Sequence, residues 1–381
     1  MHPETTPSAA ASPEAHTRFA AAYRVLEDAV RDHAFPGCAF GVMAGGETVI
    51  QDALGRFTYD EDAPPVTAET VFDVASLTKV VSTTAAAMLL HQRSRINLDL
   101  LLAELLPGFV AGRAANDPAR RVTLRHLLAH SSGLPGYVEF FRTAQTPEPL
   151  LDACLHLPLQ AEPGARAEYS DPGFILLGKA LEALMQENLD TWTAREIFQP
   201  FGLNATLFCP PESARAEIPP TEIDNAFRHR RIQGEVQDEN AFVLGGVAGH
   251  AGLFSSVPDL LRFAGEVLSA GTRPAERRDV GSGKAARIFA QRTIEIFSER
   301  QGPPSSSRAL GWDTPSENSS SGRYFSPHSI GHLGYSGCSL WIDLDAAIAI
   351  VLLTNRTWPH RESQKIRQVR PAFHDAVRAA L

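Results

Sequence analysis

Residues 72–90 read FDVASLTKVVSTTAAAMLL, and within them Ser76 and Lys79 form an SxxK tetrad at the head of an apolar run. Residues three apart on a helix lie on one face, so the Lys79 amine can reach the Ser76 hydroxyl. The chain has only four lysines, and no other lysine has a serine three residues before it. The tetrad therefore predicts a serine nucleophile with a lysine base beside it.

The residues around the tetrad supply the environment that this chemistry needs. A serine hydroxyl becomes a good nucleophile only when a base takes its proton, and a lysine is such a base when burial or nearby cations lower its pKa. The apolar residues on both sides of Lys79 predict burial, and a helix N-terminus at Ser76 would favour the alkoxide. The alternative is a capping serine with an outward-pointing lysine.

Composition and charge exclude several classes of function. At 381 residues the chain can fill one large domain or two ordinary ones. A net charge of -9 without any basic cluster argues against nucleic acid or an anionic membrane as partner. The four cysteines stand singly in apolar settings, so they indicate small core residues and neither a metal knuckle nor a disulfide framework; they are Cys38, Cys154, Cys209 and Cys338.

The first residues predict the cellular location. Residues 1–15 are polar, rich in Pro, Ala, Thr and Ser, and acidic where charged, unlike a secretory signal. We expect a disordered leader over residues 1–16. No stretch approaches membrane-spanning length, so we predict a cytoplasmic protein without a membrane partner. The sequence gives no indication of oligomeric state.

The order of apolar patterns predicts an α/β (α+β) fold. Apolar runs at 37–43 and 48–57 flank a Gly-Gly turn and indicate a hairpin, and two further strands are expected at 339–343 and 347–354. Helical patterns fill most of the remainder, at 17–33, 98–106, 124–130, 149–156, 171–186, 258–269 and 361–381.

We therefore predict an antiparallel sheet built from N- and C-terminal strands, flanked by terminal helices, with an inserted all-helical domain. The sheet-containing domain would take residues 17–80 and 245–381. The mainly helical insertion would take residues 81–244.

Two later segments supply further parts of a site. Tyr169 precedes a predicted helix, where a phenol can shuttle protons if a neighbouring ammonium lowers its pKa. Residues 331–337 read GHLGYSG and lead into a strand. Glycines there let a ligand approach the backbone, whose N–H groups can bind an oxyanion.

In chain order, the SxxK tetrad, the triplet at 169–171 (YSD) and the triplet at 332–334 (HLG) resemble the class C beta-lactamase, penicillin-binding protein and family VIII esterase superfamily of serine hydrolases. Residues 122–135 (VTLRHLLAHSSGLP) are also similar to that superfamily. The resemblance covers nearly all of the chain after residue 20 and implies a beta-lactamase/transpeptidase-like fold. Residues 236–255 (VQDENAFVLGGVAGHAGLFS) are similar to the N-acetylmuramyl-L-alanine amidase-like subgroup of cell-wall recycling.

The resemblance implies a role for each motif residue. Ser76 would be the acylated nucleophile, Lys79 its base partner and Tyr169 the proton shuttle. The backbone N–H groups of Ser76 and Tyr335 would form the oxyanion hole.

Four further residues are predicted to bind the substrate. Asp171 stands where the superfamily has asparagine, and would either repel an anionic substrate or orient Lys79. His332 stands where many relatives carry lysine and brings no obligatory charge, which weakens carboxylate recognition and weighs against true beta-lactamase activity. Gly334 belongs to the same glycine-rich segment. His250 either lines the substrate cleft or hydrogen-bonds a tight turn.

Other chemistries lack their motifs. His126 and His130 lie four apart but without the glutamate of HExxH or a third ligand, so we expect structural roles and no metal. No P-loop, dinucleotide fingerprint or GxSxG elbow occurs, so no cofactor is expected.

The sequence thus predicts a serine hydrolase that works through a covalent acyl-enzyme on a small molecule. The favoured substrate is a muropeptide fragment, cleaved by an amidase or peptidase-like reaction. One alternative is a promiscuous carboxylesterase acting on short acyl esters. The other is a protein that binds beta-lactams or cell-wall fragments with little turnover.

Overall fold

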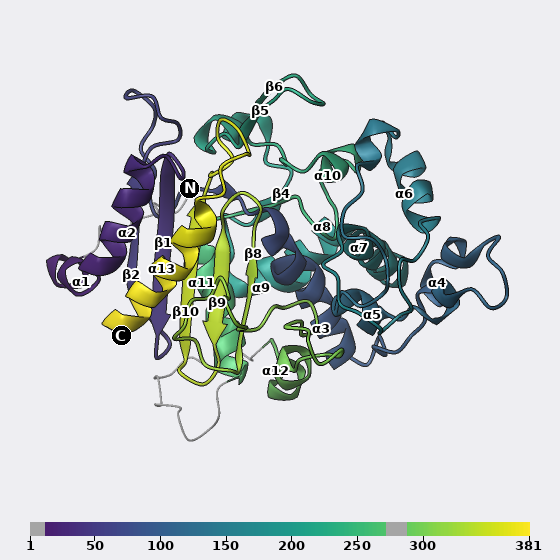
Figure 1. Cartoon of the computed structure of the whole chain (residues 1–381). Helices are drawn as coiled ribbons and strands as arrows, with labels where there is room; N and C mark the ends of the chain where they lie inside the picture. The colour runs from purple at the N-terminus through teal and green to yellow at the C-terminus, as the bar shows by residue number, and fades with distance from the viewer. Residues whose placement is uncertain (1–11, 272–287) are drawn as a thin grey trace.

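A five-stranded antiparallel sheet forms the centre of one side of the molecule (Figure 1). The computed structural model describes residues 12–271 and 288–381. Strands from the two ends of the chain meet at the β1–β10 pair, where Phe40 lies opposite Leu352. In spatial order the strands are β2 (Glu47–Gly55), β1 (Gly37–Ala44), β10 (Ile348–Thr354), β9 (Ser339–Asp343) and β8 (Ser329–Leu333). The predicted hairpin and the two late strands are confirmed.

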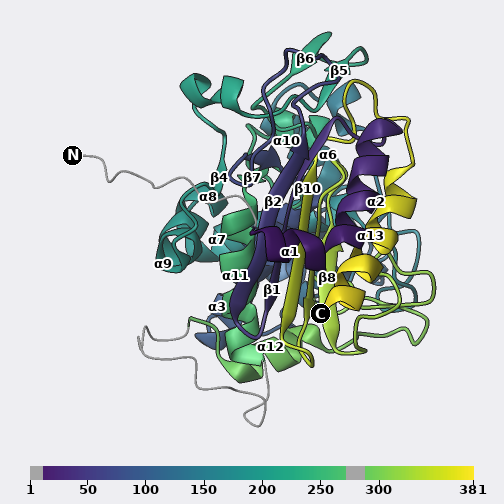
Figure 2. The ribbon, with the colours of Figure 1, turned by 90° about the vertical axis from the view of Figure 1, so that its left-hand side faces the viewer.

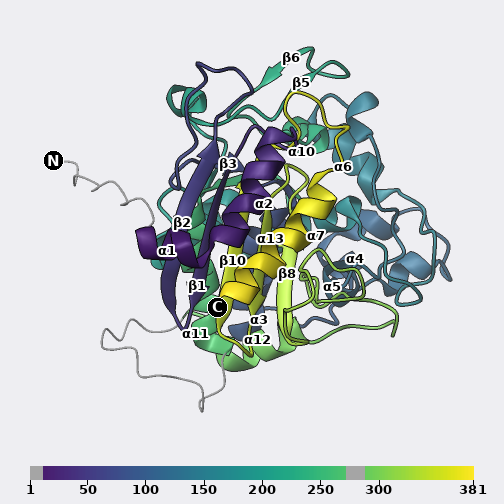
Figure 3. The ribbon, with the colours of Figure 1, turned by 60° about the vertical axis from the view of Figure 1, so that its left-hand side comes forward.

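Terminal helices cover one face of this sheet. Helices α2 (Ala20–Arg31) and α13 (Ile366–Ala380) lie side by side on it, as Figure 3 shows. Their apolar faces bury Tyr23 and Phe373, whose rings both pack edge-on against Phe40 of β1. The flanking terminal helices predicted from the sequence are therefore present.

The opposite face of the sheet packs on α11 (Val257–Gly271), so the sheet lies between two helical layers (Figure 2). Gly41 of β1 is pressed against Val257 and Leu261, and a Cβ at Gly41 would lie 2.6 Å from Val257. Helix α12 (Gln291–Ser298) packs beside α11. In the chain, α11 and α12 follow the helical region and precede β8 of the sheet.

The helical region lies beyond the β8 edge (Figure 1). Its helices are α3 (Ala85–Gln92), α4 (Leu102–Leu105), α5 (Leu124–Leu128), α6 (Pro147–Leu155), α7 (Asp171–Met185), α8 (Leu189–Thr193), α9 (Gln199–Phe201) and α10 (Glu239–Val243). Thr123 caps α5 as the sequence predicts, and Ser170 caps α7 by accepting the Gly173 N–H.

The inserted region is not all helical, which corrects the prediction. β4 (Leu207–Phe208) joins β3 (Phe72–Asp73) and β7 (Leu253–Ser255) in a three-stranded sheet, while β5 (Glu222–Asp224) pairs with β6 (Arg230–Ile232). Strands of two or three residues are too short to produce an alternating pattern in the sequence.

Two other boundaries differ from the prediction. The helix expected at 98–106 is reduced to α4, because residues 98–102 hydrogen-bond to residues 122–125 instead. The leader expected at 1–16 overlaps α1 (Pro13–Arg18), a helix that Ser12 caps. Residues 1–11 and the polar stretch that follows Gly271 lie outside the described residues. No described helix has the length and apolar character needed to cross a membrane.

Arg370 of α13 ties the terminal helix to the turn after β8. Its guanidinium is buried and donates to the carbonyls of Gly334, Gly337 and Cys338, at 2.6, 3.1 and 2.9 Å. Burial lowers the pKa of Arg370 to about 10, which leaves the guanidinium charged at neutral pH. A single side chain therefore fixes the conformation of the turn that contains Tyr335.

We predict that Arg370→Met destabilises the fold by about 3 kcal/mol, because three buried carbonyls lose a charged donor. The measurement is urea unfolding, with Arg24→Met on the exposed side of α2 as the matched control. Equal stability of the two variants would contradict this role for Arg370.

Candidate active site

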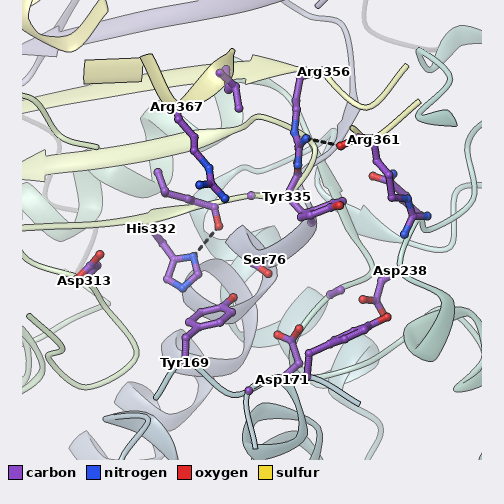
Figure 4. Close-up of a pocket in the computed structure, with 18 of the residues that line it drawn as sticks. Ser76, Tyr169, Asp171, Asp238, Asp313, His332, Tyr335, Arg356, Arg361 and Arg367 are labelled. Carbon is purple, nitrogen blue, oxygen red and sulfur yellow. Dashed lines mark hydrogen bonds between the residues drawn. The ribbon is translucent and has the colours of Figure 1, made fainter. Parts of the chain in front are cut away.

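A cavity of about 880 Å³ lies between the β8 edge, the start of α7, the start of α10 and the start of α13. Figure 4 shows Ser76, Tyr169, Asp171, His332 and Tyr335 around it. Gly334 lies in the same wall. Of the predicted site residues, only Lys79 and His250 are not in contact with the cavity, and both lie directly behind Ser76 and Asp171. Segments more than 250 residues apart thus meet at one place.

A strained turn presents Ser76 to the cavity. Ala75 has a φ of 48°, a left-handed conformation that non-glycine residues adopt only when the surroundings hold them in it. Asp73 does this, because its Oδ1 accepts the Ala75 N–H at 2.8 Å while its Oδ2 accepts the Gln237 N–H at 2.7 Å. Thr78 also bonds the Ala75 carbonyl, at 2.6 Å.

The helix that carries the tetrad is not regular, in contrast to the prediction. Residues Ala75–Leu77 form a 3₁₀ turn, Lys79–Thr84 form a π-helix, and α3 begins only at Ala85. π-helical turns are uncommon and are frequent at functional sites. The irregular turns still bring Lys79 Nζ to 2.9 Å from Ser76 Oγ, so the contact expected from the SxxK spacing is present.

The amine of Lys79 is fully buried and surrounded by oxygen atoms. Besides Ser76 Oγ, Nζ donates to Asp171 Oδ1 at 2.7 Å and to the His250 carbonyl at 3.0 Å. The side chain of Lys79 is 0% exposed and that of Asp171 is 16% exposed. The alternative of an outward-pointing lysine is therefore wrong, and Asp171 orients Lys79.

The charge state of Lys79 differs from the sequence-based expectation. Burial alone would lower its pKa, but the adjacent Asp171 carboxylate more than offsets this and raises the pKa of Lys79 above its ordinary value. The sequence predicted a lysine with a lowered pKa, because it showed the apolar neighbours and not the carboxylate 92 residues away. At rest the pair is an ammonium and a carboxylate.

Tyr169 completes the group around the nucleophile. Its hydroxyl hydrogen-bonds with Ser76 and Lys79, and Lys79 Nζ lies 4.7 Å from the centre of its ring. Burial raises the pKa of Tyr169, which outweighs the opposite effect of Lys79, so the phenol is neutral at rest. His130 stacks on the Tyr169 ring at 4.6 Å, and its Nδ1 accepts the Ser170 N–H at 2.9 Å.

A tight turn after β8 holds the second backbone donor. Gly334 N–H bonds the Cys338 carbonyl at 2.7 Å, and Tyr335 projects from the turn with 49% of its surface exposed. A Cβ at Gly334 would lie 2.4 Å from the Val74 carbonyl oxygen. Only glycine therefore lets the turn approach the segment just before Ser76 this closely. Within the described residues no acceptor bonds the Tyr335 N–H, which leaves it available beside Ser76.

His332 forms a neutral wall of the cavity. Its Nδ1 lies 2.8 Å from the Leu333 carbonyl, which requires a proton on Nδ1, so Nε2 carries the lone pair. Burial, together with Lys79 and Arg308, holds the pKa of His332 well below its ordinary value. Nε2 is buried and has no hydrogen-bond partner among the described residues.

His250 is buried, and its imidazole Nε2 lies 2.9 Å from Asp238 Oδ1. Asp238 lines the cavity and caps α10 through the Ala241 N–H. Burial opposes the ionisation of Asp238, but His250 and other neighbours lower the pKa of Asp238 to about 2. The backbone carbonyl of His250 accepts a hydrogen bond from Lys79 Nζ, so His250 helps to position the amine.

The cationic side of the cavity was not predicted from the sequence. Five arginines line it, namely Arg308, Arg356, Arg361, Arg367 and Arg370. Among the described residues Arg367 makes no side-chain hydrogen bond or ion pair, and Figure 4 shows it directed toward the region of His332. Arg308 lies 5.2 Å from the centre of the Tyr169 ring. These arginines come from distant segments, so no local motif marks them.

His126 and His130, for which the sequence predicted structural roles and no metal, both make local contacts. His126 Nδ1 accepts the Thr123 N–H, and His130 contacts Ser170 and Tyr169. Three buried carboxylates do converge elsewhere, at Glu222, Asp224 and Glu239. They are already paired with Arg361 and Arg228, which fill the space that a cation would take.

The fold and this arrangement define a serine hydrolase built on an SxxK helix. A sequence model of the Beta-lactamase family matches residues 22–372. The chain belongs to the Beta-lactamase family and is a serine hydrolase of that family.

Related proteins support the same assignment. A protein of Escherichia coli O157:H7 named "Putative D-alanyl-D-alanine carboxypeptidase" is 30% identical over 361 residues, which cover 86% of this chain and 80% of the relative. A protein of the same name from Salmonella paratyphi B is 29% identical over 365 residues, with the same coverage.

Solved structures confirm the beta-lactamase/transpeptidase-like fold. EstCE1, described as a hydrolase with promiscuous acyltransferase activity, superposes with a TM-score of 0.74 at 21% identity, covering 95% of this chain and all of EstCE1. A penicillin-binding protein homologue from Caulobacter crescentus gives 0.72 at 18% identity, covering 99% of this chain and 100% of the homologue.

We predict that Asp73→Ala slows acylation about 100-fold, because the turn that aims Ser76 loses its support. Its effect on stability depends on pH. Burial raises the pKa of Asp73 to about 6, above its ordinary 3.8, so the stabilisation linked to its protonation is fully present below 3.8 and is lost as pH rises through 6.

The loss of unfolding free energy in Asp73→Ala should therefore be larger at about pH 5 than at about pH 8. Urea titrations at both pH values, with exposed Asp62→Ala as the control, measure this difference. A pH-independent loss together with normal acylation would show that Asp73 does not have this role.

Proposed function

We propose that this protein is a serine amidase or peptidase that hydrolyses small cell-wall peptide fragments through a covalent acyl-enzyme. Ser76 attacks the scissile carbonyl, and Lys79 is its proton partner. Tyr169 protonates the leaving group. The backbone N–H groups of Ser76 and Tyr335 bind the oxyanion, and water then releases the acyl group.

The observation that carries the choice of substrate is the cationic side of the cavity. Arg308 and Arg367 lie in the wall that includes His332 and can bind a carboxylate, so the missing lysine at position 332 does not remove anion recognition. The names of the two bacterial relatives refer to a D-alanyl-D-alanine carboxypeptidase, whose substrate ends in a free carboxylate.

The size of the cavity supports a peptide rather than a short acyl ester. About 880 Å³ is near the upper end of small-molecule sites. Both charges of a short peptide find complements here, since Asp238 and Asp171 line the side opposite to Arg367 (Figure 4). The cytoplasmic location, the division into residues 17–80 with 245–381 and residues 81–244, and the substrate-binding roles of Asp171, His332, Gly334 and His250 stay predictions.

A side-by-side assay tests the substrate class. We expect hydrolysis of N-acetylmuramyl-L-alanine or of a peptide ending in D-alanyl-D-alanine, weaker hydrolysis of p-nitrophenyl butyrate, and little hydrolysis of nitrocefin. All turnover should be lost in Ser76→Ala. Cleavage of the ester alone would contradict the cell-wall assignment, and one stoichiometric burst without turnover would identify a binding protein.

Arg367→Met tests carboxylate recognition. We expect KM for a carboxylate-terminated peptide to rise about 10-fold or more, because a charged hydrogen bond is lost, while kcat/KM for the uncharged p-nitrophenyl butyrate stays unchanged. Arg24→Met is the matched control. An equal effect on both substrates would show that Arg367 does not bind the carboxylate.

A further inference from the structure

The contacts of Lys79 leave its role as a base incomplete. Nζ donates hydrogen bonds to Ser76 Oγ, Asp171 Oδ1 and the His250 carbonyl, and the Tyr169 hydroxyl contacts it as well. An ammonium has three N–H donors and no lone pair. When all three donors are used in this way, Lys79 cannot accept the proton of Ser76.

The other neighbour of the nucleophile does not solve this problem. Tyr169 hydrogen-bonds with Ser76, but burial raises its pKa and keeps the phenol protonated. A neutral phenol is a weak proton acceptor. The strongest acceptor within one hydrogen bond of Lys79 is therefore the carboxylate of Asp171, 2.7 Å from Nζ.

We propose that Asp171 is the final acceptor of the Ser76 proton during acylation, and that Lys79 relays the proton to it. This inference rests on the proposed function, in which Ser76 is acylated. It gives position 171, where the superfamily has asparagine, a chemical role that asparagine cannot perform.

Each step conserves protons and electron pairs. Nζ first passes one N–H proton to Asp171 Oδ1, which gives a neutral amine and a carboxylic acid. The amine turns about the Cε–Nζ bond so that its lone pair faces Ser76 Oγ. It takes the hydroxyl proton as Oγ bonds to the carbonyl carbon and the carbonyl π pair moves onto the oxygen as the oxyanion.

Collapse of the intermediate reverses the proton movement. The oxyanion pair re-forms the carbonyl as the bond to the leaving group breaks, and the leaving group takes a proton from the Lys79 ammonium, directly or through Tyr169. Asp171 then returns its proton to Nζ. The products are the acyl-enzyme and the protonated leaving group, with the ion pair restored.

The titratable groups that face the Lys79–Asp171 pair do not account for a difference between the pH profiles of acylation in the wild type and in Asp171→Asn. Burial holds the pKa values of His130 and His332 well below the ordinary value and raises those of Tyr137 and Tyr169, and Asp238 has a pKa of about 2. Burial also raises the pKa of Asp73 to about 6, but Asp73 is present in both the wild type and Asp171→Asn, so it does not displace one profile from the other. The remaining neighbour is the imidazole of His250, which bonds Asp238, while only the His250 backbone carbonyl contacts Lys79.

The relay and a direct lysine base predict opposite effects of Asp171→Asn. In the relay the reactive form is the ion pair, so acylation falls in acid only when the carboxylate is protonated. The Asp171→Asn variant must use the neutral Lys79 amine alone. The acid limb of its pH–rate profile, where the acylation rate falls toward low pH, therefore moves to higher pH. If Lys79 acts alone in the wild type, Asp171 merely raises its pKa, and removing the carboxylate moves the limb to lower pH.

The test is single-turnover acylation by p-nitrophenyl acetate, followed at the isosbestic wavelength of the released phenol across the pH range. We expect a wild-type rate that is flat between about pH 6.5 and 9, and an acid limb in Asp171→Asn displaced upward by about one pH unit or more. Asp152→Asn, an exposed change of equal charge on α6, should leave the wild-type profile unchanged. A downward displacement in Asp171→Asn overturns the relay.

Two further measurements distinguish a failure of the relay from a failure of the proposed function. If Asp171→Asn does not fold, the wild-type profile decides, because a direct base requires the rate to rise about tenfold per pH unit through neutrality. Ser76→Ala tests the proposed function independently. Acylation that persists in Ser76→Ala shows that Ser76 is not the nucleophile. If acylation is lost in Ser76→Ala and the acid limb of Asp171→Asn moves to lower pH, only the relay is overturned.

Discussion

The buried ion pair between Lys79 and Asp171 is the contact on which the site depends. It joins the π-helix that begins at Lys79 to the first residue of α7, in an environment where Lys79 is fully buried. An unpaired charge at this depth would cost several kcal/mol. The pair therefore fixes the relative position of two segments that are 92 residues apart in the chain.

Neighbouring contacts extend this constraint outward. Asp73 holds the strained turn before Ser76, and His130 accepts the Ser170 N–H while stacking on Tyr169. On the sheet side, Arg370 fixes the turn that carries Tyr335. Each of these side chains is buried and bonds backbone groups of another segment. Ser76, Tyr169 and the turn that carries Tyr335 thus have little freedom to move relative to one another.

The charged side chains around the cavity bear on which substrate it can bind. Carboxylates lie on the side of α7 and α10, and arginines lie near β8 and α13. Proteins similar to this chain differ in the activities that their names state, from D-alanyl-D-alanine carboxypeptidase to acyltransferase. The fold alone does not select among them, and the side chains that line the cavity must do so.

The sequence by itself predicted the main strands, most of the longer helices and the candidate reactive residues. The spacing of Ser76 and Lys79, the continuous apolar run of β10 and the cap at Thr123 are local patterns with local causes, and each was found in the expected form. The resemblance of three ordered motifs further indicated Tyr169 and Tyr335, which line the same cavity as Ser76.

Only the tertiary structure decided the charge state of Lys79, the neutral tautomer of His332 and the arginines beside it. It also decided that the SxxK helix is irregular and that the inserted region contains short strands. The reason is that a pKa, a tautomer or a π-helical turn depends on groups brought close in space. Asp171 affects Lys79 from 92 residues away at 2.7 Å, a distance that no local pattern encodes.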